Sequence, residues 1–457
     1  MTIERKEMQE IVKSYKRPIG VALGSHSALD ALSGFRNYGF KGLVYTTPQR
    51  AEIYLREQRV GNPDEYIFDL PSVVREDLIV ADNIDDIVKK KNEEWKEAVL
   101  ILKQYKDVLK KENMEGIVEL EGVQIPNRAF AVYVGEKNCR EIENDFTVPI
   151  LGSRRLLKIE NREEEKKNYY WYLEKAGIPH PKEIKYLVEA KGIRLLEKVD
   201  QPIVIKVPHS GRRLERGFIF SADGRSLEEE VEKEVLAGHI LVEDLKSARA
   251  EEYIPGVTAN FNFFYSPINA QQEWGEVEKY VSRQKLANEF LSIDERRETT
   301  HDGIVRMLAK EQLKADWTKT RYPISFEVTA HGLISLRESL IRKIYPVADS
   351  FVEITQKEEP PGMIGAYCIQ TLMTFEEQPY VEAVSQGVYD AAGKTLFDFV
   401  PKTQDIATRH GGGTNVHMGL GSQYANAKYG RPMSTGDRIA LEMKRALEKG
   451  LLTEIVT

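Results

Sequence analysis

The chain has 457 residues, 41% hydrophobic and 30% charged, which predicts a globular protein of about two or three lobes. Lys and Arg total 65 against 72 Asp and Glu, and the formal net charge of -7 argues against a general nucleic-acid binder. Two cysteines, Cys139 and Cys368, are too few for a disulfide framework or a zinc site. No apolar run approaches the ~20 residues of a membrane helix, and the charged N-terminus lacks the apolar core of a signal peptide. We therefore expect a cytoplasmic protein with no nucleic-acid or membrane partner.

The first 150 residues predict a doubly wound α/β domain. A helix over 3–16 precedes the apolar run Ile19–Leu23, which predicts a buried parallel strand. A helix after residue 27 and a second strand at Gly42–Thr46 complete a strand–turn–helix–strand unit. Further strands are predicted at 66–70 and 116–120, with a charged helical stretch at 84–112.

Beyond residue 150 the pattern predicts an α+β region. Charges crowd the piece 271–300, so we expect a mobile loop there. The hydrophobic periodicity predicts helices at 161–176, 226–237 and 434–450, and strands at 203–207, 217–221, 250–254, 260–265, 324–329 and 332–336.

The first strand leads into a helix through Gly24, Ser25, His26 and Ser27. Backbone N–H groups and the positive end of a helix dipole meet at such a turn, so a phosphate group could bind there. His26 could donate to that phosphate or to a base. A capped helix start with a surface histidine would have the same sequence.

Lys206 lies inside the apolar strand 203–207, where an unpaired ammonium group is costly to bury. Its partner is either a nucleotide phosphate or a structural carboxylate. The following loop carries Gly211, Gly217 and three arginines, which weakly favours phosphate.

Another polar segment, 251–254, ends a predicted strand just before a Pro-Gly turn. It begins with the carboxylates of Glu251 and Glu252, which could bond an adenine or ribose edge. A solvated edge strand would look the same.

The densest polar cluster runs from Asp405 to His417 and contains Arg409, three consecutive glycines and Asn415. A carboxylate on a strand suits Mg²⁺, which takes oxygen ligands and shares them with substrate phosphates. Arg409 could clamp a transferring phosphoryl group in two places. A zinc site at His410 and His417 is disfavoured, because no thiol or further imidazole lies nearby in the sequence.

Segments along almost the whole chain resemble one known family, the archaeal PurP family of formate-dependent 5-aminoimidazole-4-carboxamide ribonucleotide (AICAR) ligases in the ATP-grasp superfamily. They occur in the family's order. The segments are LGSHSALDALSGFRNYGF near the start, VPILGSRRLLKIE at 148–160, IVIKVP at 203–208, AEEYIPG at 250–256, HDGIVRMLAKEQL at 301–313, LRESL at 336–340, PPGMIGAYCIQTL at 360–372, RHGGGTN at 409–415 and PMSTGDRIALEMKRAL at 432–447.

The resemblance implies a Rossmann-like pre-ATP-grasp domain at 1–150 and a two-lobed ATP-grasp domain at 151–457, with its small lobe at 180–255. It implies that ATP converts formate to formyl phosphate, which the 5-amino group of AICAR attacks to give the formamido nucleotide FAICAR, ADP and phosphate in purine biosynthesis. The acyl phosphate must be shielded from water. The implied cofactors are ATP and Mg²⁺, with Mn²⁺ as a substitute, and the implied assembly is a homo-oligomer with small-molecule substrates.

The resemblance also implies roles for individual residues. Gly24, Ser25, His26 and Ser27 would hold the AICAR side together with Ala129 and His331. ATP would be contacted by Lys158, Lys206, Glu251, Glu252, Tyr253, Ile254 and Glu298. Asp405 with Gln370 would bind the metal ion, and Arg409 and Asn415 would face the transferring phosphoryl group.

Several positions depart from the family pattern. Ala129 replaces a serine that touches AICAR, His331 replaces an asparagine, and the shorter Asp405 replaces a glutamate. The glycine-rich phosphate lid becomes the arginine-rich 209–217, and additional segments lie around 271–297 and 374–403. Two alternatives stay open: a related ATP-grasp ligase with another amine or acid, and a nucleotide-binding protein whose active site has decayed.

Overall fold

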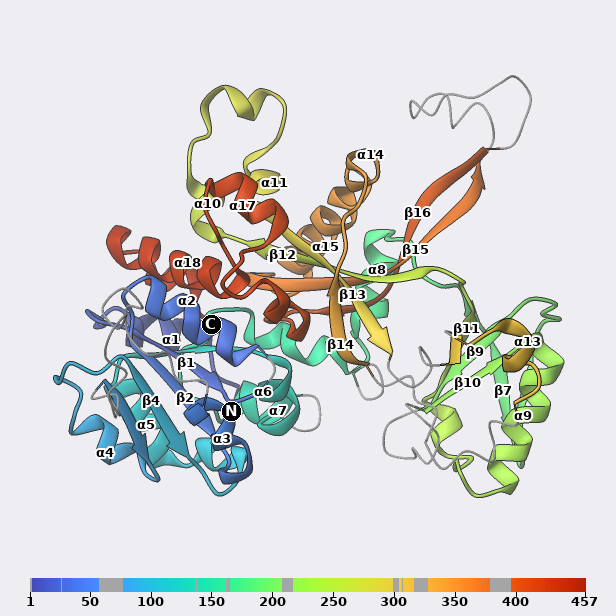
Figure 1. Ribbon diagram of the computed structural model, residues 1–457, viewed down its shortest axis with the longest axis horizontal. Helices are drawn as coiled ribbons and strands as arrows, with labels where there is room; N and C mark the ends of the chain where they lie inside the picture. The colour runs from blue at the N-terminus through green and yellow to red at the C-terminus, as the bar shows by residue number, and fades with distance from the viewer. Residues whose placement is uncertain are drawn as a thin grey trace.

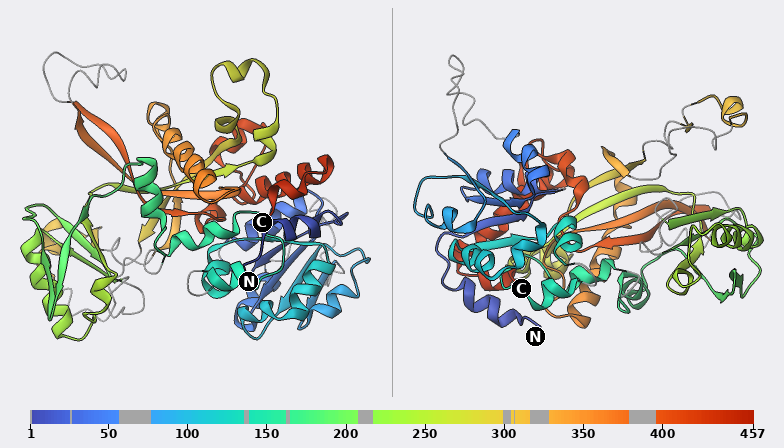
Figure 2. Two further views of the ribbon diagram at one scale, coloured as in Figure 1. Left: turned by 180° about the vertical axis from the view of Figure 1, so that it is seen from behind. Right: turned by 90° about the horizontal axis from the view of Figure 1, so that it is seen from below.

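The structure is a computed structural model that describes residues 2–25, 27–56, 77–135, 139–161, 165–207, 217–298, 304–305, 307–315, 328–378 and 396–457. Figure 1 shows an N-terminal α/β domain, a large sheet with helices beside it, and a small lobe on the far side of that sheet. The C-terminal helices return to the N-terminal domain, so the two chain ends lie in the same part of the molecule (Figures 1 and 2). No described helix is long and apolar enough to cross a membrane.

A five-stranded parallel sheet with the order β3-β4-β2-β1-β5 forms the N-terminal domain. Every residue of β1 and β2 is buried, as expected of strands in a parallel sheet covered on both faces. The predicted doubly wound domain is therefore confirmed. Its strands are β1 (Ile19–Leu23), β2 (Gly42–Thr46), β3 (Leu78–Ala81), β4 (Glu97–Ile101) and β5 (Gly122–Ile125), and its helices are α1 (Arg5–Val12), α2 (Ala28–Asn37), α3 (Pro48–Arg56), α4 (Ile84–Val88), η2 (Tyr105–Leu109), α5 (Lys111–Glu119), α6 (Arg128–Tyr133) and α7 (Arg140–Asn144).

Two predictions for this domain are wrong. The stretch 84–112, predicted as helix, contains the buried strand β4, whose short apolar core is flanked by charged residues. The strand predicted at 116–120 is the end of helix α5, where Gly116 lies against Ile84, and the strand follows at β5. The predicted strand at 66–70 lies outside the described residues.

The large sheet is antiparallel, with the order β14-β13-β12-β15-β16. Phe261, Ile293, Ile369 and Ile406 lie opposite one another on four neighbouring strands and are fully buried in one apolar cluster. Helix α8 and helix α15 contribute to the same cluster, so they cover this face. The elements are β12 (Val257–Tyr265), β13 (Asn288–Glu298), β14 (Val328–Leu333), β15 (Gly365–Gln378), β16 (Leu396–Ala407), α8 (Tyr169–Ala176) and α15 (Tyr345–Glu358).

Strand β13 corrects the prediction of a mobile loop over 271–300. The first part of that range does hold only short helices, but residues 288–298 form a strand between β12 and β14. Its polar residues alternate with the buried residues Leu291 and Ile293, as expected of a strand with one polar face. The high content of charged residues made this strand look like a loop in the sequence. The predicted strand at 324–329 lies mostly outside the described residues.

The small lobe is built on a four-stranded antiparallel sheet with the order β10-β9-β11-β6. One helix packs on it, and a two-stranded ribbon lies alongside. The elements are β6 (Glu183–Ile184), β7 (Tyr186–Glu189), β8 (Gly192–Leu195), β9 (Ile203–Lys206), β10 (Phe218–Ser221), α9 (Gly224–Leu236), η7 (Asp244–Lys246) and β11 (Arg249–Glu252).

Helix α18 (Thr435–Lys449) joins the large sheet to the N-terminal domain by packing on α2. A Cβ on Gly34 would lie 2.1 Å from the carbonyl oxygen of Gly436, so the two helices touch at glycines. The other short helices are η4 (Arg154–Glu160), α10 (Pro267–Gln271), η8 (Gly275–Lys279), α11 (Arg283–Ala287), α13 (Ala309–Gln312), α14 (Glu338–Ile341), η10 (Gly412–His417), α17 (Gln423–Tyr429) and α19 (Leu452–Ile455).

Candidate active site

Four polar side chains lie in a row on the face of the large sheet opposite the apolar cluster. Asn260 pairs with Asp294 on one side and with Gln370 on the other, and Gln370 pairs with Asp405. Residues directly opposite each other on neighbouring strands point to the same side of a sheet. The sheet therefore brings Asp405 and Gln370, predicted as metal ligands, into one row with the carboxylate of Asp294, which was not a predicted site residue.

Asp294 is fully buried and held by three side chains. Its Oδ2 accepts hydrogen bonds from Asn260 Nδ2 and His331 Nδ1, both at 2.7 Å, and its Oδ1 accepts from Asn262 Nδ2 at 2.6 Å. A buried carboxylate is stable only when it is paired or hydrogen-bonded in this way. His331, predicted to touch the substrate, is therefore anchored in the polar face while 24% of its side chain stays exposed.

The three-glycine turn packs directly on this pair. A Cβ on Gly413 would lie 2.2 Å from Asp294 Oδ2 and 2.7 Å from His331 Nδ1, so no larger residue fits. Helix η10, which contains Gly413 and Asn415, contacts α2, β13 and β14. The turn predicted to face the phosphoryl group thus lies against the polar face of the sheet.

Arg409 at the start of the turn forms a bidentate ion pair with Glu160. Its Nε and Nη2 lie 3.1 and 3.0 Å from the two carboxylate oxygens. Arg128 Nη1 is 3.6 Å from the same carboxylate. Arg409 is thus oriented by η4, a contact that the sequence did not reveal.

The turn at 24–27 meets the glycine turn from the N-terminal domain. Ser27 Oγ donates to the carbonyl oxygen of His410 at 3.4 Å, and Asp30 Oδ2 lies 3.0 Å from His410 Nε2. Ser25 Oγ accepts from Arg50 Nη1 at 2.9 Å. The turn predicted to hold AICAR and the turn predicted to face the phosphoryl group therefore converge, whereas His26 lies outside the described residues.

A Cβ on Gly24 would lie 2.7 Å from the side chain of Thr46, so the backbone there runs too close to β2 for a larger residue. This close approach keeps the turn compact beside the strand.

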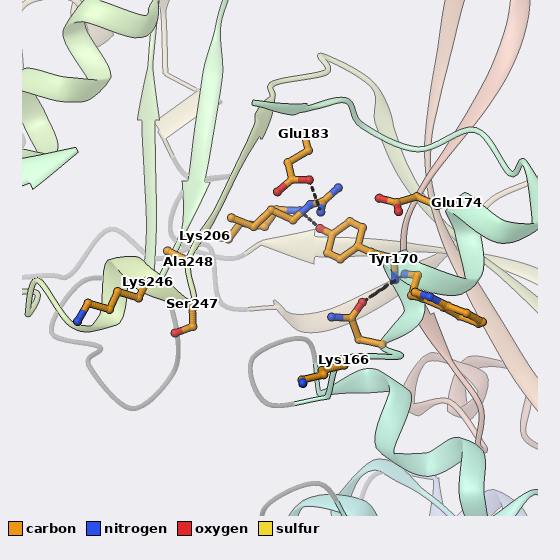
Figure 3. A pocket seen from close by; sticks show the side chains of 11 residues that line it. Lys166, Tyr170, Glu174, Glu183, Lys206, Lys246, Ser247 and Ala248 are labelled. Carbon is orange, nitrogen blue, oxygen red and sulfur yellow. Dashed lines mark hydrogen bonds and ion pairs between the residues drawn. The ribbon is translucent and has the colours of Figure 1, made fainter. Parts of the chain in front are cut away.

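Lys206 has a structural carboxylate as its partner in the small lobe. Its ammonium group forms an ion pair with Glu251 and donates to Tyr170 Oη at 3.1 Å, and that hydroxyl donates to the other Glu251 oxygen at 2.9 Å. Figure 3 shows Lys206 directed toward the ring of Tyr170. Of the two partners left open by the sequence, the carboxylate is the one present.

A cavity of about 280 Å³ lies beside this group, between helix α8 and the small lobe. Its lining holds four cations, on Lys166, Lys206, Lys246 and Arg249, and two carboxylates, on Glu174 and Glu183. The excess of positive charge favours an anionic ligand. Asp405 is not among its lining residues, so this cavity is separate from the polar row on the large sheet.

Other residues predicted to contact ATP are placed as follows. Lys158 forms an ion pair with Glu143 at 3.1 Å, at the edge of the N-terminal domain. Glu252 accepts a hydrogen bond from the Lys182 backbone, and Tyr253 is 45% exposed beside Phe220. Ile254 is partly buried next to Tyr253, and the side chain of Glu298 lies outside the described residues.

Ala129, predicted to touch the substrate, is 1% exposed. Its methyl group belongs to the apolar core of the N-terminal domain. The whole residue is therefore buried, and its methyl group is not open to a ligand.

Of the two predicted metal ligands, Asp405 supplies the kind of oxygen that Mg²⁺ prefers. Gln370 lies on the adjacent strand, but its Oε1 accepts from Arg296 Nη1 at 2.7 Å and would have to release that guanidinium to bind the ion. Mg²⁺ commonly takes one or two protein oxygens and completes its shell with water and phosphate. Within the described part of the chain no group of three His, Cys, Asp or Glu could hold a metal ion by itself.

Charge is concentrated around Cys368, which lies two residues before Gln370. Burial raises the pKa of the Cys368 thiol, Asp294 and Asp405 raise it further, and Arg409 and Arg296 oppose them. A raised pKa disfavours the thiolate, the form in which a cysteine acts as a nucleophile. Two carboxylates and two arginines therefore lie close enough to Cys368 to act on the same thiol: Asp294, Asp405, Arg409 and Arg296.

Five residues of the site were not predicted from the sequence: Asp294, Asn260, Asn262, Arg296 and Glu160. A usable signal was the alternation of polar and apolar residues over 258–265 and 288–298, which predicts strands with one polar face. Glu160 carried no such signal, because its partner Arg409 is 249 residues away in the sequence.

Two family models match the chain. One is described as "Domain of unknown function (DUF1297)" and matches residues 226–457. The other, "Protein of unknown function (DUF1246)", matches residues 20–102 and 94–184.

Named relatives match over the full length. A protein from Methanopyrus kandleri is 31% identical over 458 residues, covering 100% of both chains, and bears the name "5-formaminoimidazole-4-carboxamide-1-(beta)-D-ribofuranosyl 5'-monophosphate synthetase". A protein of the same name from Methanothermobacter thermautotrophicus is 30% identical, covering 100% of this chain and 99% of its own. The crystal structure of an IMP biosynthesis protein PurP from Thermococcus kodakaraensis matches with a TM-score of 0.56 and 24% identity, covering 96% of this chain and 100% of the other.

Proposed function

The chain belongs to the 5-formaminoimidazole-4-carboxamide-1-(beta)-D-ribofuranosyl 5'-monophosphate synthetase family, and we propose that it joins formate to the 5-amino group of AICAR at the expense of ATP. The family resemblance and the ATP-grasp fold expected from the sequence are confirmed. The chain is accordingly an ATP-dependent carbon–nitrogen ligase. Its products would be FAICAR, ADP and phosphate.

One observation supports this proposal above the others. The glycine turn with Arg409 and Asn415 packs against the polar row of Asp294, Asn260, Gln370 and Asp405. A phosphoryl-transfer site needs cations, oxygen ligands and a close backbone approach in one place. This face of the sheet offers all three.

In this proposal, different residues of the chain bind the metal ion, the phosphoryl group and AICAR. Asp405 and Gln370 would hold Mg²⁺, which when bound neutralises charge on the nucleotide phosphates. Arg409, fixed by Glu160, would stabilise the phosphoryl group as it moves to formate. The turn at 24–27 would bind the AICAR side.

The small lobe would hold the nucleotide. The cations around the cavity at Lys206 favour its phosphates, and residues 251–254 would contact the adenine. Asp405 does not line the cavity at Lys206, and we expect the small lobe to move toward the large sheet when ATP binds.

Formation of ADP by the purified protein tests the proposal. We expect turnover with ATP, Mg²⁺, formate and AICAR together, and loss of turnover when formate or AICAR is left out. Turnover that requires another amine or acid would instead indicate a related ligase with different substrates. ATP binding with no ADP under any substrate mixture would indicate a decayed site.

A homo-oligomer and tolerance of Mn²⁺ stay predictions of the same proposal. Sedimentation at several protein concentrations and a Mn²⁺ titration of turnover would test them.

A further inference from the structure

Arg50 lies beside the turn at 24–27, and we propose that it binds the 5'-phosphate of AICAR. In the described part of the chain, the side chain of Arg50 bonds only to uncharged groups. This inference rests on the proposed function, which names AICAR as the substrate, and it adds the residue that recognises the charged end of that nucleotide. Arg50 was not among the site residues predicted from the sequence.

Residues that follow four different strands of the parallel sheet meet at the Arg50 guanidinium. Arg50 itself follows β2, in the first turn of α3. Ser25 follows β1, and its Oγ accepts from Nη1 at 2.9 Å. Tyr133 follows β5, and its Oη accepts from Nη2 at 3.4 Å, while Tyr105 follows β4, with its ring centroid 5.8 Å from the guanidinium carbon. Because these strands are parallel, their carboxyl ends lie at one edge of the sheet, where open α/β sheets bind ligands.

The two tyrosine rings hold the guanidinium in place. Tyr105 and Tyr133 are stacked with ring centroids 5.3 Å apart, and the guanidinium carbon of Arg50 lies 5.4 Å from the Tyr133 centroid. Tyr105 is fixed in turn, because its hydroxyl donates to the carbonyl oxygen of Gly24 at 2.9 Å. A guanidinium has five N–H groups, and the bonds to Ser25 and Tyr133 leave others for an anion.

The charge of Arg50 distinguishes it from the arginines of the phosphoryl side. Arg409 and Arg128 both face the carboxylate of Glu160, so their charges are offset within the protein. Arg50 has hydroxyl groups and aromatic rings as its partners among the described residues, and its side chain is partly buried. A phosphate monoester carries nearly two negative charges at neutral pH, and arginine binds such a group with paired, charge-assisted hydrogen bonds.

The turn that contains Ser25 extends from Arg50 to the phosphoryl side. Ser25 accepts from Arg50, while Ser27 donates to the carbonyl oxygen of His410 at 3.4 Å. Asn127 connects the two, because its Nδ2 donates to the Ser25 carbonyl oxygen at 3.1 Å and its backbone pairs with that of His410. AICAR carries its phosphate and its reactive amine at opposite ends. A nucleotide lying along this turn would therefore keep its phosphate on Arg50 and bring its amine toward the glycine turn.

Binding measurements on Arg50→Gln test the inference. The substitution removes the charge but keeps a long side chain with an N–H donor beside Ser25. Calorimetric titrations would compare AICAR with its nucleoside, which lacks only the 5'-phosphate. We expect the Kd of AICAR to rise roughly 10- to 100-fold and the Kd of the nucleoside to stay within about twofold of normal. In steady-state assays the KM for AICAR should rise in the same way, while the KM for ATP stays normal.

Two further variants strengthen the comparison. Arg50→Lys keeps the charge but not the planar fork, so it should bind AICAR more tightly than Arg50→Gln and less tightly than the unsubstituted protein. Arg56→Gln is the matched control, because Arg56 lies on the same helix but pairs at the surface with Glu52 at 2.6 Å. The Arg56 variant should keep both dissociation constants.

An AICAR Kd within about twofold of normal in Arg50→Gln would overturn the inference. An equal rise in Kd for AICAR and for the nucleoside would also overturn it, because Arg50 would then maintain the shape of the site instead of binding the phosphate. No binding of AICAR to the unsubstituted protein would overturn both the inference and the proposed function.

The proposed function can fail separately from the phosphate site. If Arg50→Gln weakens AICAR alone but the unsubstituted protein never forms FAICAR, the phosphate site stands and the proposed reaction is wrong. If FAICAR forms and the KM for AICAR is unchanged in Arg50→Gln, the reaction stands and the phosphate site is wrong.

Discussion

Arg409 and Glu160 are joined by two hydrogen bonds, Nε to Oε1 at 3.1 Å and Nη2 to Oε2 at 3.0 Å, although 249 residues separate them. The pair connects η4, which ends at Glu160, to the residues that directly follow β16, the strand of Asp405. Both side chains are largely buried, at 6% and 14% exposure. Arg409 therefore has a fixed direction before any nucleotide binds.

Glu160→Gln should reduce both stability and turnover. The amide cannot match both guanidinium N–H groups, so we expect a loss of about 1–3 kcal/mol in the free energy of unfolding. We also expect a lower kcat, because Arg409 loses its fixed direction. Urea unfolding and steady-state kinetics would measure the two effects.

Glu4→Gln is the control for that variant. Glu4 pairs with Arg155 at the surface, where the two side chains are 63% and 40% exposed. Such pairs contribute about 0–1 kcal/mol. Equal losses in the Glu4 and Glu160 variants would contradict a special role for the Arg409 contact.

Gly413→Ala should disrupt the site while Gly411→Ala is tolerated. At Gly413 the added methyl carbon would lie 2.2 Å from a buried carboxylate oxygen of Asp294, whereas at Gly411 its nearest neighbour would be 3.6 Å away. The Gly411 backbone also has φ -76, which any residue adopts. We expect only Gly413→Ala to lose activity and melting temperature, and similar behaviour of the two variants would contradict the packing described.

Asp405→Asn should weaken Mg²⁺ binding, so that half-maximal turnover needs a higher Mg²⁺ concentration. It should also lower kcat by at least roughly 100-fold. The amide keeps the shape of the side chain but removes the charge that attracts the metal ion. Asp398→Asn is the matched control, because Asp398 lies on the same strand and pairs with Lys343 instead. A normal Mg²⁺ titration in Asp405→Asn would refute the metal assignment.

Glu289 should govern acid stability. Burial alone would raise the pKa of Glu289, but Arg438, Lys428 and Tyr429 outweigh it and lower the pKa to about 2. A carboxyl group whose pKa is lowered by folding adds stability above its unfolded value, and that stability is lost as the pH falls toward the folded value. We expect roughly 3 kcal/mol to be lost from about pH 4.5 down to pH 2.

In Glu289→Gln this pH dependence should flatten, and Arg438, which is fully buried, should lose one of its two carboxylate partners and keep Glu442. Removal of one member of a buried pair costs about 3–5 kcal/mol. Unfolding by urea at pH 7 and pH 3 would measure both effects. An unchanged slope of stability with pH would show that another group is responsible.

Sequence patterns predicted the elements that are uniform along their length. Strand β1 is apolar throughout and β2 is apolar up to Thr46, so their positions were predicted correctly. The position of α18 was also predicted correctly, because it has one apolar stripe and the N-cap residue Ser434. Strand β13 was not predicted, because one of its faces carries the polar residues of the site. In the sequence, Asp294 and Arg296 look like the charged residues of a loop.

The site could be predicted only in part. The motif around Arg409 and Asn415 indicated phosphoryl chemistry from residues close together in the sequence. Asp294 draws its partners from 34 and 37 residues away, so no local pattern could show that it holds His331. For Lys206 the sequence predicted that a partner must exist, while only the pairing of β9 with β11 shows that Glu251 is that partner.

Transfer of the formate carbon is the most direct test of the central claim that this chain is a formate-dependent ligase. The purified protein would be incubated with ATP, Mg²⁺, AICAR and ¹³C-formate, and the nucleotide product and ADP would be quantified. We predict one labelled formyl group on the nucleotide for each ADP released. ADP release with no ¹³C in the nucleotide would contradict the account.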